Sequence, residues 1–189
     1  MKARLLIAVV ALQAAWVIST VARQEMLLRS GTVVLLESGP VDPRDLLRGD
    51  YVILSHKISV LPAALFDGGL PDQLQGEWRA WTPVWVRLEK RGQFHEAVAA
   101  SFSPLDPDAE HPVLRGTVFN SSWVGGERGR RETVWVNYGI ERYYVREGTG
   151  RPTGTITVEA VVTSSGTSFI RQVYIDGHPY ADVMRKQGR

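Results

Sequence analysis

The stretch Trp81–Ser101, which reads WTPVWVRLEKRGQFHEAVAAS, decides the fold class. Apolar or aromatic residues recur at strand spacing over Trp81–Lys90 and again over Phe94–Ser101, as in strands with one buried face. Between these runs, Arg91-Gly92-Gln93 has the length and the glycine of a short hairpin loop. The stretch therefore predicts two antiparallel strands joined by a tight turn.

Strand signals of the same kind continue along most of the chain after Gly31. The expected strands are Thr32–Glu37, Tyr51–Val60, Val113–Asn120, Thr133–Tyr138, Thr155–Thr163 and Thr167–Ile175, separated by clusters of Gly, Pro and Asp. The last two flank Ser164-Ser165-Gly166 as a second hairpin, and a single helical turn is expected at Ala63–Phe66. We therefore predict a β-rich domain over residues 31–183, followed by a polar tail at residues 184–189.

The N-terminal segment Leu5–Ala22 contains no charged residue for 18 positions and follows Lys2 and Arg4. A helix of that length is about 27 Å long, close to the hydrocarbon thickness of a bilayer. Cationic residues before a span favour the cytoplasmic side, so the rest of the chain is expected outside the cytoplasm. We predict an anchor over residues 1–30, with a transmembrane helix at residues 5–22 and a short helical extension.

The predicted fold class is thus mainly β, one antiparallel sandwich or barrel-like domain after an N-terminal transmembrane helix. Two other interpretations of the helix stay open. A cleaved signal peptide needs a small-x-small site, and Thr20 in Ser19-Thr20-Val21-Ala22 makes this site poor. A buried helix of a cytosolic protein is the third interpretation.

The composition narrows the classes of partner and chemistry. The 189 residues carry a formal net charge of +2 with a slight Arg surplus spread along the chain, so no nucleic acid partner is expected. The chain has no cysteine, which rules out disulfides, thiolate nucleophiles and cysteine-based metal sites. Its four histidines, at positions 56, 95, 111 and 178, do not follow metal-ligand spacing. We expect neither a metal site nor a cofactor.

The segment Gly49–His56, GDYVILSH, resembles the signature of the GDYxxLxY family of bacterial membrane-anchored proteins. The pattern is filled by Gly49, Asp50, Tyr51 and Leu54, and His56 stands where the pattern has its final tyrosine. The similarity extends to Tyr138–Val145, to Glu147-Gly148 and to Ile175-Asp176-Gly177. The resemblance implies an extracytoplasmic domain on a single N-terminal anchor, and it supplies no catalytic mechanism.

Alternation along the expected strand places Leu54 and His56 on its core-facing side. At 3.3 Å per residue, Asp50 lies about 20 Å from His56, which excludes an Asp–His pair within the motif. In the structural interpretation, Gly49 adopts a turn conformation and Asp50 binds nearby backbone amides. In the functional interpretation, Asp50 or Tyr51 lines a ligand cleft.

The densest group of aromatic and charged residues lies at positions 138–147. Its members that could line a polar ligand site are Tyr138, Glu141, Arg142, Tyr143 and Glu147. Cross-strand ion pairs and tyrosines are also common on half-exposed sheets, where each contributes little. Both a ligand-facing and a purely structural role therefore stay open for these residues.

An enzymatic alternative rests on Ser38-Gly39-Pro40 followed by Gly49-Asp50-Tyr51-Val52, which loosely resembles the entry to the signal-peptidase family. Those β-rich, membrane-anchored enzymes use a serine that a lysine activates, and Lys57 and Lys90 are the available bases. The methionine that usually follows the nucleophile is missing here. A Ser/Lys endopeptidase is therefore the second choice.

The leading functional prediction is a non-catalytic binding or accessory module of the bacterial envelope, on the periplasmic side of the cell membrane. Its expected partners are the membrane, through residues 5–22, and an envelope or integral membrane protein. Aromatic side chains are enriched at binding hot spots. The candidates for such a contact surface are Trp78, Trp81, Trp85 and Trp123.

Overall fold

The computed structural model describes residues 2–41, 51–70, 82–124, 130–145 and 154–187. It divides into two units, Met1–Gly31 and Thr32–Arg189, and each is described by itself.

The first unit is helix α1 (Lys2–Ser30), which is long and apolar enough to cross a membrane. The helix continues past the charge-free segment to Ser30, and Arg29 Nε lies 2.7 Å from Glu25 Oε1, an i,i+4 pair that supports the last turns. The helix ends where the N–H of Gly31 donates to the carbonyl of Leu27 at 3.2 Å. The prediction of an N-terminal apolar helix is confirmed, and this helix is a candidate for a single membrane span.

The second unit is built mainly from strands. They are β1 (Thr32–Val41), β2 (Tyr51–His56), β3 (Val60–Pro62), β4 (Thr82–Arg91), β5 (Phe94–Ser101), β6 (Val113–Val124), β7 (Arg130–Asn137), β8 (Arg142–Tyr144), β9 (Ile156–Val162), β10 (Ser168–Ile175) and β11 (His178–Pro179). Two 3-10 turns, Lys57–Ser59 and Ala63–Leu65, and helix α2 (Tyr180–Gln187) complete it.

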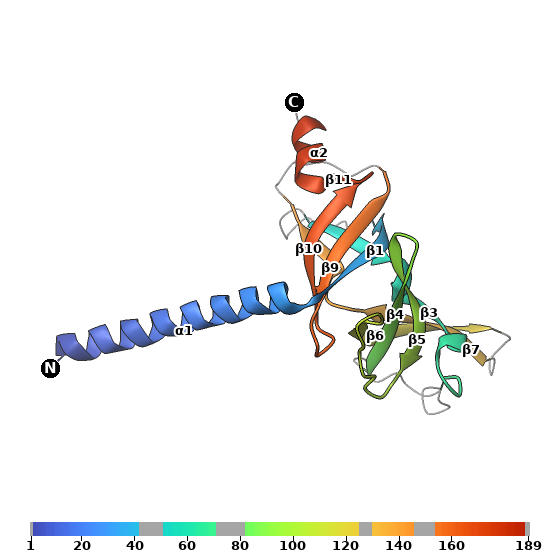
Figure 1. Ribbon diagram of the computed structural model, residues 1–189, viewed down its shortest axis with the longest axis horizontal. Coiled ribbons are helices and arrows are strands. Elements are labelled where there is room, and N and C mark those ends of the chain that lie inside the picture. The colour runs from blue at the N-terminus through green and yellow to red at the C-terminus, as the bar shows by residue number, and fades with distance from the viewer. Residues whose placement is uncertain (1, 42–50, 71–81, 125–129, 146–153, 188–189) are drawn as a thin grey trace. The chain divides into compact units, whose positions relative to one another are not determined.

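The strands form two antiparallel sheets, with the orders β11-β10-β9-β1-β2-β8 and β3-β7-β6-β4-β5. The sheets curve into a half-barrel and a nearly closed barrel, so the prediction of a mainly antiparallel β fold is confirmed. The hairpin predicted around Arg91-Gly92-Gln93 is present as β4–β5, with Arg91 opposite Phe94. The second predicted hairpin is β9–β10, whose strands run side by side in orange and red in Figure 1.

One hydrophobic core joins the two sheets. In β1, Val34 and Leu36 face inward, and in β4 Val84, Val86 and Leu88 do so, with intervening residues more exposed. These side chains belong to a single buried cluster with others from β6, β7, β9 and β10. Burying each such aliphatic side chain contributes about 1.5–3 kcal/mol to the free energy of folding. The alternating residues seen in the sequence are therefore the ones that stabilise the fold.

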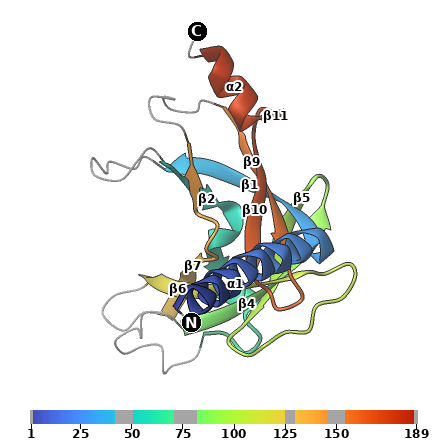
Figure 2. The ribbon, with the colours of Figure 1, turned by 90° about the vertical axis from the view of Figure 1, so that its left-hand side faces the viewer.

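The chain changes sheets inside the segment that was predicted as one strand, Tyr51–Val60. Strand β2 ends at His56, the 3-10 turn Lys57–Ser59 follows, and Val60 begins β3 in the other sheet. Ile58 and Ser59 are both buried, although consecutive residues of one strand would face opposite sides. This prediction was wrong because the chain turns at Lys57–Ser59 and passes from one sheet to the other. Figure 2 shows β2 beside its partner strand β1.

The C-terminal end of the described chain is helical. Helix α2 covers Tyr180–Gln187, which includes most of the segment expected to be a polar tail. Tyr180 and Met184 are one helical turn apart and only 3% exposed each, so one face of α2 packs into the core.

Candidate functional site

The structure brings together the two groups of residues that the sequence singled out. Strand β8 pairs with β2, so that Tyr143 lies opposite Val52 and Arg142 opposite Ile53. Next to this pairing, the N–H of Leu54 donates to the carbonyl of Glu141 at 2.7 Å. The motif strand and the aromatic group therefore form one cluster at an edge of the six-stranded sheet.

His56 lies inside this cluster and is 1% exposed. Its Nε2 is 3.1 Å from the carbonyl oxygen of Ile140, and its Nδ1 is 2.7 Å from the hydroxyl of Ser38. Because a carbonyl only accepts, Nε2 carries the proton and Nδ1 accepts the hydroxyl proton of Ser38. Burial lowers the pKa of His56 to about 4, so the imidazole is neutral at pH 7. The neutral ring links β1, β2 and the loop before β8.

That loop is held by Tyr138 and Glu141. The hydroxyl of Tyr138 donates to the carbonyl of Ile58 at 2.8 Å. The Glu141 carboxylate accepts the backbone N–H groups of Tyr138 and Gly139. Burial raises the pKa of Glu141, and these backbone hydrogen bonds oppose that increase. Both side chains are thus engaged with the backbone of their own domain.

Other predicted site residues lie at the sheet edge or outside the described residues. The ring of Tyr143 makes an edge-to-face contact with Tyr180 of α2, at a centroid distance of 5.3 Å. Arg142 is exposed on β8. Of Tyr51, only the backbone is described, and it pairs with Tyr144. Gly49, Asp50 and Glu147 lie outside the described residues, as do Trp78, Trp81 and the side chain of Trp123.

In the structure, the serine and the first candidate lysine of the Ser/Lys endopeptidase alternative contact other residues. Lys57 Nζ lies 3.0 Å from Glu96 Oε1 and 3.3 Å from Glu37 Oε2, and these contacts raise its pKa. A lysine base must be unprotonated and within reach of the serine, whereas Lys57 is a protonated surface residue and Ser38 binds His56. Lys90 is exposed in β4, near the hairpin turn.

Ser38 and His56 have the bonding of a nucleophile and its base, but their burial argues against catalysis. Ser38 is 8% exposed and His56 is 1% exposed. A substrate carbonyl must approach the serine oxygen at contact distance. The pair is better explained as a satisfied polar contact inside the core, because buried polar groups require partners.

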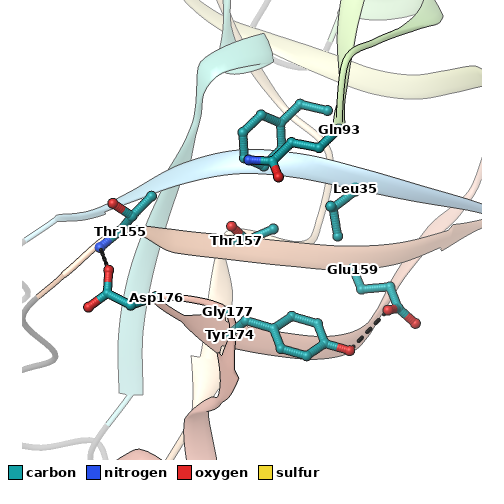
Figure 3. Close-up of a pocket in the computed structure, with 9 residues that line it drawn as sticks. Leu35, Gln93, Thr155, Thr157, Glu159, Tyr174, Asp176 and Gly177 are labelled. Atoms are coloured by element: carbon teal, nitrogen blue, oxygen red, sulfur yellow. Dashed lines mark hydrogen bonds between the residues drawn. The ribbon is translucent and has the colours of Figure 1, made fainter.

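A groove lies on the outer face of the six-stranded sheet, away from this cluster. It has a volume of about 560 Å³ and is lined by Leu35, Gln93, Phe94, Thr155, Thr157, Glu159, Tyr174, Asp176 and Gly177. Figure 3 shows Thr157 and Leu35 on the sheet, with Gln93 on one side and Tyr174 and Asp176 on the other. The β4–β5 turn and the β10–β11 turn thus form its two walls.

Hydrogen bonds fix both walls of the groove. The N–H of Leu35 donates to Nδ1 of His95 at 3.1 Å, which holds β5 beside β1. On the other side, the N–H of Thr155 donates to Oδ1 of Asp176 at 2.8 Å, and the N–H of Asp176 donates to the carbonyl of Thr155 at 2.9 Å. Asp176 has a φ of +49°, which an aspartate in a tight turn tolerates.

The carboxylate of Asp176 fits only because residue 154 is glycine. A Cβ at Gly154 would lie 2.3 Å from Oδ2 of Asp176, and Gly154 has a φ of +120°. None of the groove residues was a predicted site residue, although Asp176-Gly177 is part of the similarity to the GDYxxLxY pattern. Within the described residues, no group of three or more His, Asp or Glu side chains could hold a metal ion.

The fold and the motif together define a class of protein. It is an antiparallel β domain that follows an apolar N-terminal helix, and its strand β2 begins at Tyr51 of the GDYxxL sequence. The GDYXXLXY protein family matches residues 13–173, and the chain belongs to this family. No curated protein and no solved structure matches the chain.

Proposed function

We propose that this protein is a membrane-anchored binding or accessory module of the bacterial envelope, with its β domain on the periplasmic side. The apolar helix α1 supports the anchor, because its length and composition suit a single span. Lys2 and Arg4 precede the apolar segment, which favours a cytoplasmic N-terminus.

The groove is the observation that carries the binding role. It is a preformed concave surface of about 560 Å³, within the range typical of ligand sites. Two polar groups among the described residues of the motif cluster, in contrast, are engaged inside the domain: His56 binds Ser38 and Ile140, and Glu141 binds backbone amides. This division favours binding on the outer face and a structural role for the motif.

The absence of cysteine allows a clean test of topology. Ser103 is exposed in the loop after β5, so Ser103→Cys introduces a single accessible thiol. A membrane-impermeant maleimide should label this variant in intact spheroplasts. The matched variant Ala3→Cys, at the N-terminal end of α1, should be labelled only after permeabilisation. Labelling with the opposite sidedness would contradict the proposal.

An envelope or integral membrane protein is the proposed partner, and in-cell crosslinking followed by purification from membranes tests it. Reproducible recovery of one membrane protein supports the accessory role, and repeated recovery of none argues against it. The second choice, a Ser/Lys endopeptidase, requires that Ser38→Ala abolish a processing event that depends on this protein. Unchanged processing would eliminate it.

A further inference from the structure

We propose that the groove between the β4–β5 and β10–β11 turns binds a neutral saccharide. The choice of this ligand class rests on the extracytoplasmic binding function proposed above. The groove is separate from the His56 cluster, which lies in the core.

The charge of the groove excludes anionic ligands. Among the described residues that line it, Glu159 and Asp176 are acidic and none is basic. Arg171 Nε lies 3.3 Å from Glu159 Oε1 without lining the groove, so it partly compensates the charge of that carboxylate. An anionic group would therefore meet two carboxylates and no cation. A ligand for this groove must be neutral or cationic.

The hydrogen-bonding groups of the groove suit a ligand with several hydroxyls. The amide of Gln93 and the hydroxyls of Thr155 and Thr157 line it, and each can both donate and accept. No side-chain hydrogen bond joins any of these three groups to another described residue. The register places them apart, because Thr157 pairs with Tyr174 while Gln93 comes from the other sheet's hairpin. Several separate hydroxyls of one ligand would find partners there.

Apolar surface complements these groups. Leu35, Phe94 and the ring of Tyr174 also line the groove. The C–H face of a pyranose ring packs against aromatic and aliphatic side chains, while its hydroxyls point to the sides. The groove therefore offers apolar surface to the C–H face of a sugar ring and polar groups to its hydroxyls. Its volume of about 560 Å³ accommodates a short oligosaccharide.

The groove is already ordered. The Tyr174 hydroxyl donates to Oε2 of Glu159 at 3.1 Å, a bond drawn in Figure 3 beside that of Thr155 to Asp176. The bond between Leu35 and His95 fixes the opposite wall. Binding therefore requires little ordering of side chains, which lowers its entropic cost.

A cationic peptide is the competing ligand, and the carboxylates argue against it. Glu159 is bound by Arg171 and Tyr174, and Asp176 is bound by the N–H of Thr155. Attraction to a peptide ammonium is weakened because each carboxylate already has a donor. The neutral groups of Gln93 and Thr157 can pair with peptide groups as well as with sugar hydroxyls, so a lysine peptide serves as the competing probe in the test.

Calorimetry with the full chain in phosphatidylcholine nanodiscs tests the proposal, since sugar-based detergents would compete. The probes are chitotriose, maltotriose and trilysine. We expect at least one trisaccharide to bind with a Kd below about 10 mM, and trilysine not to bind. Thr157→Val and Gln93→Ala should each weaken binding by about 3- to 10-fold, the effect of one lost hydrogen bond.

Thr117→Val is the matched control, because Thr117 is a half-buried strand residue of the other sheet. It should leave saccharide affinity unchanged. The proposal is overturned if neither trisaccharide binds at about 10 mM, if both groove variants bind as the unmodified chain does, or if trilysine alone binds. Maleimide labelling independently measures on which side of the membrane the domain lies. A failure of the saccharide proposal can therefore be distinguished from a failure of the proposed topology.

Discussion

The hydroxyl oxygen of Ser38 lies 2.7 Å from Nδ1 of His56, and the two residues are direct partners in the register of β1 and β2. Both face the core, where an unpaired polar group is costly. The histidine that replaces the last tyrosine of the family pattern therefore depends on a serine in the neighbouring strand.

Removing either partner should destabilise the domain. His56→Leu leaves the Ser38 hydroxyl and the Ile140 carbonyl without their partner, and we expect a loss of about 2–4 kcal/mol in the free energy of unfolding. Ser38→Ala should cost about 1–2 kcal/mol, because only Nδ1 loses its donor. Urea unfolding followed by tryptophan fluorescence measures both changes.

The double variant Ser38→Ala/His56→Leu should lose less than the sum of the two single losses, since no hydroxyl is left unpaired. Strict additivity would mean that the contact between these residues is not energetically coupled.

Acid should destabilise the protein through His56. The pKa of His56 is about 4 in the folded chain and 6.5 for an ordinary histidine. Between these two pH values the unfolded chain binds a proton at His56 and the folded chain does not. This contribution is fully present above pH 6.5 and falls by about 3 kcal/mol as the pH decreases towards 4. The difference in unfolding free energy between the unmodified chain and His56→Gln should follow this window. A difference that does not change between pH 7 and pH 4 would contradict the assignment.

Gly116 in β6 should not tolerate a methyl group. A Cβ there would lie 2.3 Å from Cγ1 of Val136 and 2.9 Å from Cδ1 of Tyr138. Gly116→Ala should therefore cost about 1–3 kcal/mol through overpacking. The control is Gly39→Ala in β1, where a Cβ meets nothing within 4 Å and stability should change by less than about 1 kcal/mol. Equal thermal midpoints for the two variants would refute the overpacking.

Tyr138→Phe should lower the unfolding free energy by about 1–2 kcal/mol, because it removes the bond to the carbonyl of Ile58 at a buried site. Tyr174→Phe removes a comparable bond to Glu159 at a half-exposed site, where water replaces the hydroxyl, and should cost less. Chemical denaturation of both variants ranks the two losses, and the reverse order would show that burial does not control them.

Much of the fold is predictable because alternation reports which face of a strand is buried. Strand β5 covers Phe94–Ser101 as the pattern predicts, and Leu54 and His56 of β2 are both buried as expected. The change of sheet at Lys57–Ser59 could not be predicted, since the alternation continues through Ile58 while the backbone turns. Strands as short as β8 and β11 carry too few residues to show a period.

The groove could not be predicted for a different reason. Thr155, Thr157 and Glu159 are recognisable as one face of a strand. What makes them part of a concave surface is the β4–β5 turn, which is held near β1 by a bond between Leu35 and His95, 60 positions apart. Alternation within a segment contains no information on such long-range contacts.

The position of β1 has a consequence for biogenesis. This strand is the first of the domain to be synthesised, yet Thr32 pairs with Val162 of β9, far along the sequence. Such a distant pairing makes folding slow and leaves one edge of β1 unpaired until β9 has been synthesised. A nascent chain of this protein therefore cannot complete its six-stranded sheet before β9 is synthesised, and truncation before β9 would leave the edge of β1 open to aggregation.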